Sequence, residues 1–465
     1  MQLGDILDDL SIDVATSSLE ITRVENDSRD CTPGTLFFAM PGTAQHGARY
    51  AREAVARGAI CVVADEDLKL EVPVVVVPTT QLRALLAHAS AAITDHPETK
   101  AKLVGVTGTN GKTSVTSIVA SLGRALRWNT SSIGTLTSER TTPAAPELFR
   151  TFASIVANFD SATNDSLIAL EVSSHALDQH RVDGLRFCVA AFTNLSHDHL
   201  DYHGTMEEYF TAKSTLFTSE YAKRAVIWTD DPYGERLAAM TELPVTRVAR
   251  ADAVDVNTSL LGSTFFWRGH LVNSPLVGDY NVDNALLAMA IMSTLGADDA
   301  QVAASMGDVT AVPGRFDVLY GHDVTVIVDY AHTPEGLQRL LKDVRSLLPR
   351  GRIITVFGAG GDRDRSKRPE MGLVVSGASE LTIVTSDNPR SESPDAIIDA
   401  VATGFAPGAQ VVRESDRRRA IALALESATA GDVVVLAGKG HESTQTMGDL
   451  VIPFDDRVVA KELLK

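Results

Sequence analysis

Short runs of apolar residues, each followed by turn residues and a segment with helical spacing, recur along the chain. Helical spacing is clearest over Gln81–Ile93, Thr113–Leu126, Met206–Phe217 and Asn281–Leu295. Uninterrupted apolar runs are typical of strands covered on both faces of a parallel sheet. The runs predicted to form strands are Thr35–Met40, Ala59–Ala64, Val72–Val77, Leu103–Thr107, Leu167–Val172, Phe187–Thr193, Val324–Val328, Ile353–Phe357, Leu381–Thr385 and Val433–Ala437. This alternation predicts an α/β protein that binds ligands at the carboxyl ends of its strands.

Changes in this pattern divide the chain into three parts. The polar stretch Asp95–Glu98 contains a proline and predicts a linker. Residues 251–280 are richer in β-formers and glycine, which favours an antiparallel addition, and a new series of strands begins after Pro313. We therefore expect a small N-terminal α/β domain over 1–99, a central parallel-sheet domain over 100–314 and a C-terminal Rossmann-like domain over 315–465. The length of 465 residues, at about 150 per domain, agrees with three domains.

Charge and composition narrow the possible partners. The 60 acidic and 42 basic side chains leave a formal net charge of -18, which repels phosphate backbones, so nucleic acid is not expected as the main partner. No apolar run approaches the roughly 18 residues that a membrane span needs. The N-terminus, MQLGDILDDL, has acids where a signal peptide has basic residues. Cys31, Cys61 and Cys188 are too widely spaced to predict disulfides or a metal-ligand pair. We expect a soluble cytoplasmic protein.

A strand running directly into a glycine-containing loop gives the sharpest local signal, at LVGVTGTNGKTS over residues 103–114. Gly108 and Gly111 let the backbone fold around a phosphate, and the helix that opens at Lys112 favours an anion at its N-terminus. Lys112 would reach the outer phosphates, and the Thr113 hydroxyl would bind magnesium. The glycine spacing departs from the general phosphate-binding loop, and an ordinary strand-to-helix turn is the alternative. The context favours nucleotide binding, so we expect the central domain to be a P-loop-type ATP-binding domain.

This loop is one of a series of ordered motifs. They are NDSR (Asn26–Arg29), TGTNGKTS (Thr107–Ser114), LEVSSHALDQHRV (Leu170–Val182), TNLSHDHLDYHGTMEEYFTAK (Thr193–Lys213), GDYNVDNALLA from Gly278, PGRFD from Pro313, DYAHTPEGL from Asp329, GAGGDRDRSKRP from Gly358, DNPR from Asp387 and GKGHE from Gly438. Together they resemble the Mur ligase family of cell-wall precursor enzymes over essentially the whole chain. The resemblance is strongest to the members that add the third residue of the peptide.

The resemblance implies ATP-dependent amide bond formation on small-molecule substrates. ATP would phosphorylate the D-glutamate carboxylate of a UDP-MurNAc-dipeptide, and an incoming amine would attack the acyl phosphate. A monomer with Mg²⁺ as cofactor is implied as well. Domain closure would exclude water and assemble the site.

Catalytic roles carry over by resemblance to Lys112, Glu171, His199 and Lys213. Glu171 ends an apolar strand and His199 follows another, so both can converge on magnesium, with Thr113 as a further ligand. Lys213 matches a family lysine that is carbamylated to N6-carboxylysine, which would support a second magnesium. The alternatives are a solvated strand end for Glu171, His197 or His203 in place of His199, a zinc site, and an ordinary surface lysine for Lys213.

Substrate-binding positions also follow from the resemblance. Those implied for ATP are Thr107, Gly108, Thr109, Asn110, Gly111, Lys112, Thr113, Ser114, Asn284, Arg315, Asp329 and His332. Those implied for the UDP-MurNAc-dipeptide are Ser28, His46, Gly47, Thr141, Thr142, Ser173, Gln179 and Arg181. Thr43, His46 and Arg140 depart from residues common in the family, which leaves the individual contacts in this half open.

The amino acid to be added would be selected in the C-terminal domain. Arg390 completes the DNPR motif, which in the family is associated with meso-diaminopimelate. A fixed guanidinium attracts the far carboxylate of diaminopimelate and disfavours the bare ammonium of lysine. Positions implied for this substrate are Arg363, Asp387, Asn388, Pro389, Arg390, Gly438 and Glu442, of which Glu442 would meet an ammonium. The alternatives are the same chemistry with L-lysine and a catalytically silent nucleotide-binding homologue. NDSR and DNPR speak against a folylpolyglutamate synthetase.

Overall fold

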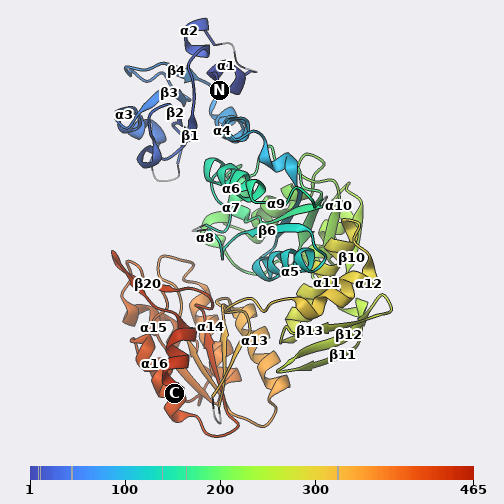
Figure 1. The fold of residues 1–465 in the computed structure, drawn as a ribbon. Coiled ribbons are helices and arrows are strands. Elements are labelled where there is room, and N and C mark those ends of the chain that lie inside the picture. Colours follow the sequence, from blue (N-terminus) through green and yellow to red (C-terminus); the bar gives the residue numbers. More distant parts are fainter. Residues whose placement is uncertain are drawn as a thin grey trace.

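The computed structural model describes residues 1–8, 10, 12–42, 45–138, 140–163, 165–321 and 324–464. It is an α/β protein with three bodies arranged one after another, as Figure 1 shows from the blue N-terminal part to the red C-terminal part. The predicted fold class is therefore confirmed. The predicted boundary at 99/100 falls within a short helix, Pro97–Lys100, and that at 314/315 lies just before β14 (Asp317–Tyr320). The boundaries themselves stay predictions.

The N-terminal body is built on a four-stranded parallel sheet in the order β1-β2-β3-β4. Its strands are β1 (Arg23–Glu25), β2 (Thr35–Phe38), β3 (Ala59–Ala64) and β4 (Val74–Val76), and its helices are α1 (Leu3–Ile6), α2 (Val14–Ser17), α3 (Ala51–Ala56) and α4 (Thr79–Ile93). Alternate residues of β2 enter different cores: Phe37 packs with the α3 side, and Leu36 and Phe38 pack with the α4 side. The uninterrupted apolar runs are explained by this burial on both faces.

The central body contains a six-stranded parallel sheet in the order β10-β9-β8-β5-β7-β6. Its strands are β5 (Lys102–Thr107), β6 (Asn129–Ile133), β7 (Ser166–Glu171), β8 (Val189–Phe192), β9 (Ala225–Trp228) and β10 (Val245–Val248). Its helices are α5 (Lys112–Ala125), α6 (Ala145–Ala157), α7 (Ser174–Asp178), α8 (Leu200–His203), α9 (Met206–Ser214), α10 (Pro232–Met240), α11 (Asp279–Thr294) and α12 (Asp299–Ser305). The sheet places the loops after β5, β7 and β8 at neighbouring positions along one edge.

Residues 251–280 contain the expected antiparallel addition. It consists of β11 (Ala253–Ser259), β12 (Gly262–Trp267) and β13 (His270–Ser274), and it packs against α11 and α12. The helix expected over Met206–Phe217 ends as an α-helix at Ser214 and continues as one tighter turn.

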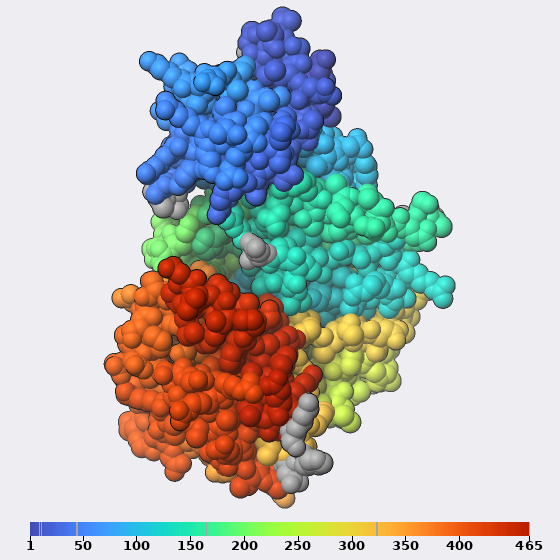
Figure 2. Space-filling model, turned by 60° about the vertical axis from the view of Figure 1, so that its left-hand side comes forward, coloured from blue at the N-terminus to red at the C-terminus, as the bar shows by residue number. Residues whose placement is uncertain are grey.

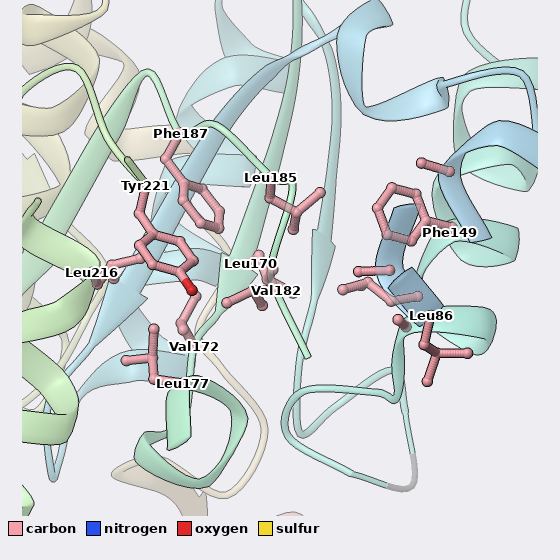
Figure 3. Packing of buried hydrophobic residues seen from close by; sticks show 14 of the residues in the cluster. Leu86, Phe149, Leu170, Val172, Leu177, Val182, Leu185, Phe187, Leu216 and Tyr221 are labelled. Carbon is pink, nitrogen blue, oxygen red and sulfur yellow. The ribbon is translucent and has the colours of Figure 1, made fainter. Parts of the chain in front are cut away.

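One hydrophobic core crosses the border between the N-terminal and central bodies. Leu86 of α4 and Phe149 of α6 belong to the same buried cluster as Leu170 of β7 and Phe187, beside β8. Figure 3 shows these side chains, with Leu86 and Phe149 grouped on one side and Phe187 on the other. This continuous apolar contact joins the N-terminal body to the central sheet.

The C-terminal body has a six-stranded sheet in the order β14-β15-β19-β16-β17-β18, in which β14 is antiparallel and the other strands are parallel. Its strands are β14, β15 (Thr325–Asp329), β16 (Ile353–Phe357), β17 (Leu381–Val384), β18 (Val411–Arg413) and β19 (Val433–Ala437), followed by a hairpin of β20 (Thr444–Met447) and β21 (Leu450–Pro453). Helices α13 (Pro334–Leu347), α14 (Lys367–Ala378) and α15 (Pro394–Ala402) cover one face, and α16 (Arg417–Ser427) and α17 (Asp456–Leu463) cover the other.

None of the helices in the described part of the chain combines the length and the apolar character that crossing a bilayer requires.

A buried ion pair fixes the two helices behind the C-terminal sheet. The Arg417 guanidinium donates to both carboxylate oxygens of Asp456, at 2.8 and 2.7 Å, and both side chains are completely buried. We expect Arg417→Met to lower the local free energy of unfolding by about 3–5 kcal/mol, because it leaves an unpaired carboxylate in the interior. Hydrogen exchange of the β19 amides measures this change. The double variant Arg417→Met/Asp456→Leu should recover part of the loss; equal instability of the double and single variants would contradict the explanation.

Candidate active site

A cavity of about 230 Å³ lies where the central and C-terminal bodies meet. We call it the interdomain cavity; Figure 2 shows the two bodies that enclose it, in teal to green and in orange to red. Predicted site residues from both bodies line it: Thr109, Asn110, Gly111, Lys112, Thr113, Thr141, Glu171, His199, Arg315, His332, Arg363, Asp387, Asn388, Arg390, Gly438 and Glu442. The residues expected to hold phosphate and those expected to hold the amino acid therefore face the same space.

Sheet topology explains this convergence. The loops that carry His332, Arg363, Arg390 and Glu442 follow β15, β16, β17 and β19, which are neighbours in one parallel sheet. The carboxyl ends of parallel strands lie at one edge, where ligands of such sheets bind. The central body presents the corresponding edge, with the loops after β5, β6, β7 and β8.

The phosphate-binding loop connects β5 to α5 as the sequence predicts. Gly108 and Gly111 have φ values of 145° and 86°, and a Cβ on Gly111 would come within 2.7 Å of the Asn284 side chain. Glycine is therefore favoured at this position by its backbone conformation, and a larger residue would also displace the end of the Asn284 side chain. The Lys112 ammonium donates to the carbonyls of Gly108 and Thr109, at 2.9 and 2.8 Å, so it lies across its own loop. Burial lowers the pKa of Lys112, and the nearby Glu171 carboxylate opposes that shift.

Glu171 is only 2% exposed, so the alternative of a solvated strand end is wrong. Its carboxylate accepts a hydrogen bond from the Thr113 hydroxyl at 2.9 Å and another from the Thr135 backbone N–H at 2.9 Å. Burial raises the pKa of this carboxyl, and the positive charge of Lys112 acts in the opposite direction. A carboxylate, a hydroxyl and an ammonium are thus gathered around the start of α5.

His199 lies at the start of α8 with a left-handed backbone, φ 56°. Burial lowers its pKa to about 3, against the opposing effect of Asp198, so the imidazole is neutral at neutral pH and has a lone pair available for a metal. The two alternative histidines have other partners. His197 lies 3.6 Å from the Asp364 carboxylate, as His199 does from that of Asp198, and His203 lies 2.8 Å from the Ser174 hydroxyl. Of the three histidines, His199 lines the interdomain cavity.

Lys213 is 1% exposed, and the alternative of a surface lysine is wrong. Its amine donates to the Gly108 carbonyl at 2.8 Å and lies 4.5 Å from the centre of the Tyr209 ring. Burial lowers the pKa of Lys213 well below its usual value, and the charge of Lys112 adds to the shift. The Lys213 amine is therefore hydrogen-bonded to the phosphate-binding loop, and Lys213 does not line the interdomain cavity.

The DNPR and GKGHE loops form the C-terminal wall of the cavity. Asn388 and Lys439 both donate to one carboxylate oxygen of Glu442, at 2.8 and 2.9 Å. One oxygen of the Asp387 carboxylate is buried without a hydrogen-bond partner, and a Cβ on Gly438 would come within 2.7 Å of it. Buried Lys439 was missed in the sequence because a lysine inside a glycine-rich motif gives no sign of which carboxylate it pairs with.

Arg390 has φ 51°, and one guanidinium nitrogen donates to the Gly361 carbonyl at 2.6 Å. Pro389 packs its carbonyl against the backbone of Gly361, which leaves no room for a side chain there. The loops after β16 and β17 are thereby fixed to each other, and Arg390 and the exposed Arg363 both line the cavity.

A second cavity, of about 250 Å³, also adjoins the phosphate-binding loop. Predicted nucleotide residues that line it are Asn110, Gly111, Ser114, Asn284, Arg315 and Asp329. The sequence did not single out Tyr280 and Tyr330, which also line it. The Arg315 guanidinium lies 4.2 Å from the centre of the Tyr330 ring, and Arg315 donates to the Thr113 hydroxyl at 3.3 Å. The cavity therefore offers aromatic surface beside the loop.

Hydrogen bonds from three neighbouring groups fix the position of the Asp329 carboxylate. Its carboxylate accepts hydrogen bonds from the Tyr280 hydroxyl and from the backbone N–H groups of Phe316 and Ala331, at 2.7–2.8 Å. These bonds join the end of β15 to the turn after Arg315 and to α11. A contact of Asp329 with ATP stays a prediction.

Asp198 connects the two bodies and was also missed in the sequence. Its carboxylate lies 3.4 Å from the Lys367 ammonium and 3.9 Å from the His332 ring, both in the C-terminal body. These partners lie far along the chain, so one histidine-rich motif could not reveal them.

The residues expected to hold the UDP-MurNAc-dipeptide fall into two groups, and of all these residues Thr141 alone lines the interdomain cavity. In the N-terminal body, the Ser28 hydroxyl donates to Glu53 at 3.1 Å, the His46 ring lies 3.2 Å from Asp65, and Gly47 packs against the Met40 backbone. Thr43 lies outside the described residues.

The second group surrounds the end of β7. Thr142 donates to the Glu171 carbonyl at 2.8 Å and accepts from the Ser173 N–H at 3.0 Å. Arg181 donates to the Thr142 carbonyl and to the Gln179 side chain, at 2.8 and 2.6 Å. Burial, with the charges of Arg140 and Arg83, lowers the pKa of Arg181 to about 10. The Thr141 hydroxyl lies 3.1 Å from that of Thr135 and faces the interdomain cavity.

Arg83 of α4 connects the two groups. Its guanidinium donates to the Gln179 carbonyl and to the Pro41 carbonyl, each at 3.2 Å. Pro41 precedes the loop that holds His46, so this arginine ties the N-terminal loop to the central body. No signal in the sequence pointed to Arg83, because this arginine stands in an ordinary helical pattern.

Comparison with known proteins assigns the chain to a family. Profiles described as "Mur ligase family, catalytic domain", "Mur ligase middle domain" and "Mur ligase, glutamate ligase domain" match residues 20–107, 106–292 and 314–440. The chain belongs to the Mur ligase family. This Mur ligase is 42% identical to a UDP-N-acetylmuramoyl-L-alanyl-D-glutamate--2,6-diaminopimelate ligase of Gloeobacter violaceus. The alignment covers 100% of this chain and 98% of the relative. An enzyme of the same name from Geobacillus kaustophilus is 42% identical over 96% of the chain and 95% of the relative.

Solved structures agree with this assignment. A structure named as a UDP-N-acetylmuramoyl-L-alanyl-D-glutamate--2,6-diaminopimelate ligase superimposes with a TM-score of 0.69 at 30% identity, covering 100% of this Mur ligase and 98% of that chain. The MurF ligase of Thermotoga maritima in complex with ADP has a TM-score of 0.65 at 19% identity, covering 96% and 97% of the two chains, and it supports the fold alone.

Proposed function

We propose that the protein is an ATP-dependent ligase that joins meso-2,6-diaminopimelate to the D-glutamate of UDP-N-acetylmuramoyl-L-alanyl-D-glutamate in peptidoglycan precursor synthesis. The observation that carries the proposal is the interdomain cavity, which Lys112 and Glu171 of the central body and Arg390 of the C-terminal body line together. The 42% identity to relatives of this name over the whole chain supports the same activity.

The chain's own groups suit each stage of the reaction. Lys112 and the N-terminus of α5 would hold the phosphoryl group as it moves from ATP to the D-glutamate carboxylate. The acyl phosphate then reacts with the amine of diaminopimelate, forming the amide bond and releasing phosphate. Enclosure between two bodies would exclude the water that hydrolyses an acyl phosphate.

The residues around the loop fit Mg²⁺ as the cofactor. Glu171 and Thr113 present a buried carboxylate and a hydroxyl 2.9 Å apart, and neutral His199 faces the same cavity. Mg²⁺ binds few protein ligands and retains water and phosphate oxygens, which suits such a sparse donor set. Among the described residues, no group of three or more His, Cys, Asp or Glu side chains could hold a metal by itself, so nothing favours the zinc alternative. Bound Mg²⁺ would neutralise charge on the phosphate oxygens.

Lys213 is proposed to carry the carbamate of N6-carboxylysine. Carbon dioxide reacts with a neutral amine, and the burial that lowers the pKa of Lys213 increases the share of that form. Protein incubated with ¹³C-bicarbonate should show a carbamate carbonyl signal by NMR, which Lys213→Arg removes. The signal should weaken as the pH falls, because protonation makes the amine unreactive. The same signal in Lys213→Arg would contradict this assignment.

The UDP-MurNAc-dipeptide is proposed to extend from the Ser28 and His46 region, past Arg83, to Thr141 at the interdomain cavity. Arg181 and its cationic neighbours suit an anionic part of this substrate. Diaminopimelate is proposed to lie between Arg390 and Arg363 on the carboxylate side and Glu442 and Asp387 on the ammonium side.

Two other functions are less well supported. L-Lysine as the added amino acid would leave Arg390 without a carboxylate partner. A catalytically silent homologue would not need the gathered set Lys112, Glu171, His199 and Lys213. The monomeric state and the cytoplasmic location expected from the sequence stay predictions.

Phosphate release tests the proposal. Purified protein is incubated with ATP, Mg²⁺ and UDP-N-acetylmuramoyl-L-alanyl-D-glutamate, in parallel with meso-diaminopimelate, with L-lysine and without an amino acid, and products are identified by mass. Turnover with diaminopimelate and much slower turnover with lysine is the expected result. Faster turnover with lysine would overturn the substrate assignment, and silence with all three would overturn the ligase assignment.

A further inference from the structure

The hairpin of β20 and β21 supports the loop that carries Arg390. Figure 1 shows β20 at the border of the C-terminal body that faces the central body. Arg390 has a left-handed backbone, which residues other than glycine rarely adopt. Its N–H donates to the Thr446 carbonyl at 3.1 Å, and its carbonyl accepts from the Gly448 N–H at 2.7 Å. Pairing with the hairpin therefore stabilises a conformation that the loop alone would disfavour.

Gln445 joins the hairpin to the same loop from inside the protein. Its side chain is 5% exposed, and its amide nitrogen donates to the Asp387 carbonyl at 2.7 Å. The next residue, Thr446, donates its backbone N–H to the Asn388 side chain at 3.0 Å. Asp387, Asn388 and Arg390 are thus all bonded to one strand. Gln445 itself does not line the interdomain cavity, so it can act on a substrate only through these residues.

The two ends of Arg390 are fixed by different elements. β20 holds its backbone, and the Gly361 carbonyl accepts from one guanidinium nitrogen at 2.6 Å. A guanidinium selects a carboxylate through the geometry of its planar fork, so a small displacement of the loop reduces selectivity. A shift of the loop backbone would therefore change where the Arg390 guanidinium points, while its charge would stay.

We propose that Gln445 is a positioning residue for amino-acid selection: it holds residues 387–390 against β20, so that Arg390 is aimed at the far carboxylate of the incoming diamino acid. The inference rests on the proposed function, because it requires a substrate with such a carboxylate.

Gln445→Met tests the inference, since methionine has a similar volume and lacks the donor. We expect the KM for diaminopimelate to rise about tenfold, with kcat within about threefold of the unchanged protein, because one buried carbonyl loses its partner and the loop shifts. The KM for ATP and kcat/KM for L-lysine should stay the same. Gly448→Ala weakens the same pairing from the turn of the hairpin, because alanine disfavours a φ of 56°, although its Cβ would meet no neighbour. It should likewise raise the KM for diaminopimelate and leave the values for ATP and L-lysine unchanged.

Val451→Thr, an exposed change in the other strand of the hairpin, is the matched control and should leave all constants unchanged. An unaltered KM for diaminopimelate in both Gln445→Met and Gly448→Ala would overturn the inference. Equal losses with diaminopimelate and lysine would also overturn it, since they indicate a general structural role. Failure of the unchanged protein to use diaminopimelate would refute the proposed function instead, so the two failures are distinguishable.

Discussion

Replacing Lys112 with methionine is expected to lower kcat by about a thousandfold or more. The Lys112 ammonium is the positive charge of the phosphate-binding loop that faces the interdomain cavity, 2.8–2.9 Å from two loop carbonyls. In enzymes that transfer phosphate, a positive side chain positioned against the transferring phosphoryl group raises kcat by about 10³-fold or more. Methionine keeps the apolar stem and its packing, while the charge and its two hydrogen bonds to the loop carbonyls are lost. Steady-state phosphate release with all three substrates measures the change.

Lys102→Met is the matched control for this prediction. Lys102 begins the same strand, β5, at the end away from the loop, where its amine pairs with Asp165 at 2.6 Å. Its replacement should change kcat by less than about twofold, since an exposed ion pair contributes little. Retention of a tenth or more of the activity in Lys112→Met would show that phosphoryl transfer does not depend on this lysine.

Replacing Arg390 with methionine is expected to lower kcat/KM for diaminopimelate by about thirtyfold or more. Loss of one partner from an enclosed charge pair costs about 2–5 kcal/mol, which corresponds to roughly 30-fold to several-thousandfold in kcat/KM. The kcat/KM for L-lysine should stay the same or rise, because lysine has no far carboxylate that Arg390 could bind. Competition between the two amino acids, with products separated by mass, measures the change in preference.

Arg413→Met is the corresponding control, because Arg413 lies in β18 of the same sheet and pairs with Asp399 on the exposed surface. It should leave the preference unchanged. An undiminished preference for diaminopimelate in Arg390→Met would assign selectivity to other residues of the cavity, and the inference on Gln445 would fail with it.

The sequence by itself determined those features whose residues lie close together along the chain. The phosphate-binding loop is complete within residues 103–114, so its strand, its two glycines and its lysine could be recognised together. Strand positions in the middle of the large sheets followed from uninterrupted apolar runs, because those strands are buried on both faces. The alternation of these runs with helices led to the α/β class, and the order of the motifs led to the family.

Only the tertiary structure decided which distant groups meet. Lys213 and the Gly108 carbonyl are 105 residues apart, and burial of this lysine follows from the packing of α9 against the loop rather than from its own helical pattern. Asp198, Arg83 and Gln445 each make contacts between separate elements, and their neighbours in sequence give no sign of them. Arg390 could be recognised from its motif, but its left-handed backbone depends on pairing with β20, more than fifty residues later. Hydrophobic periodicity and motif spacing are local properties, whereas burial, pKa shifts and the direction of a charged side chain arise from elements brought together by folding.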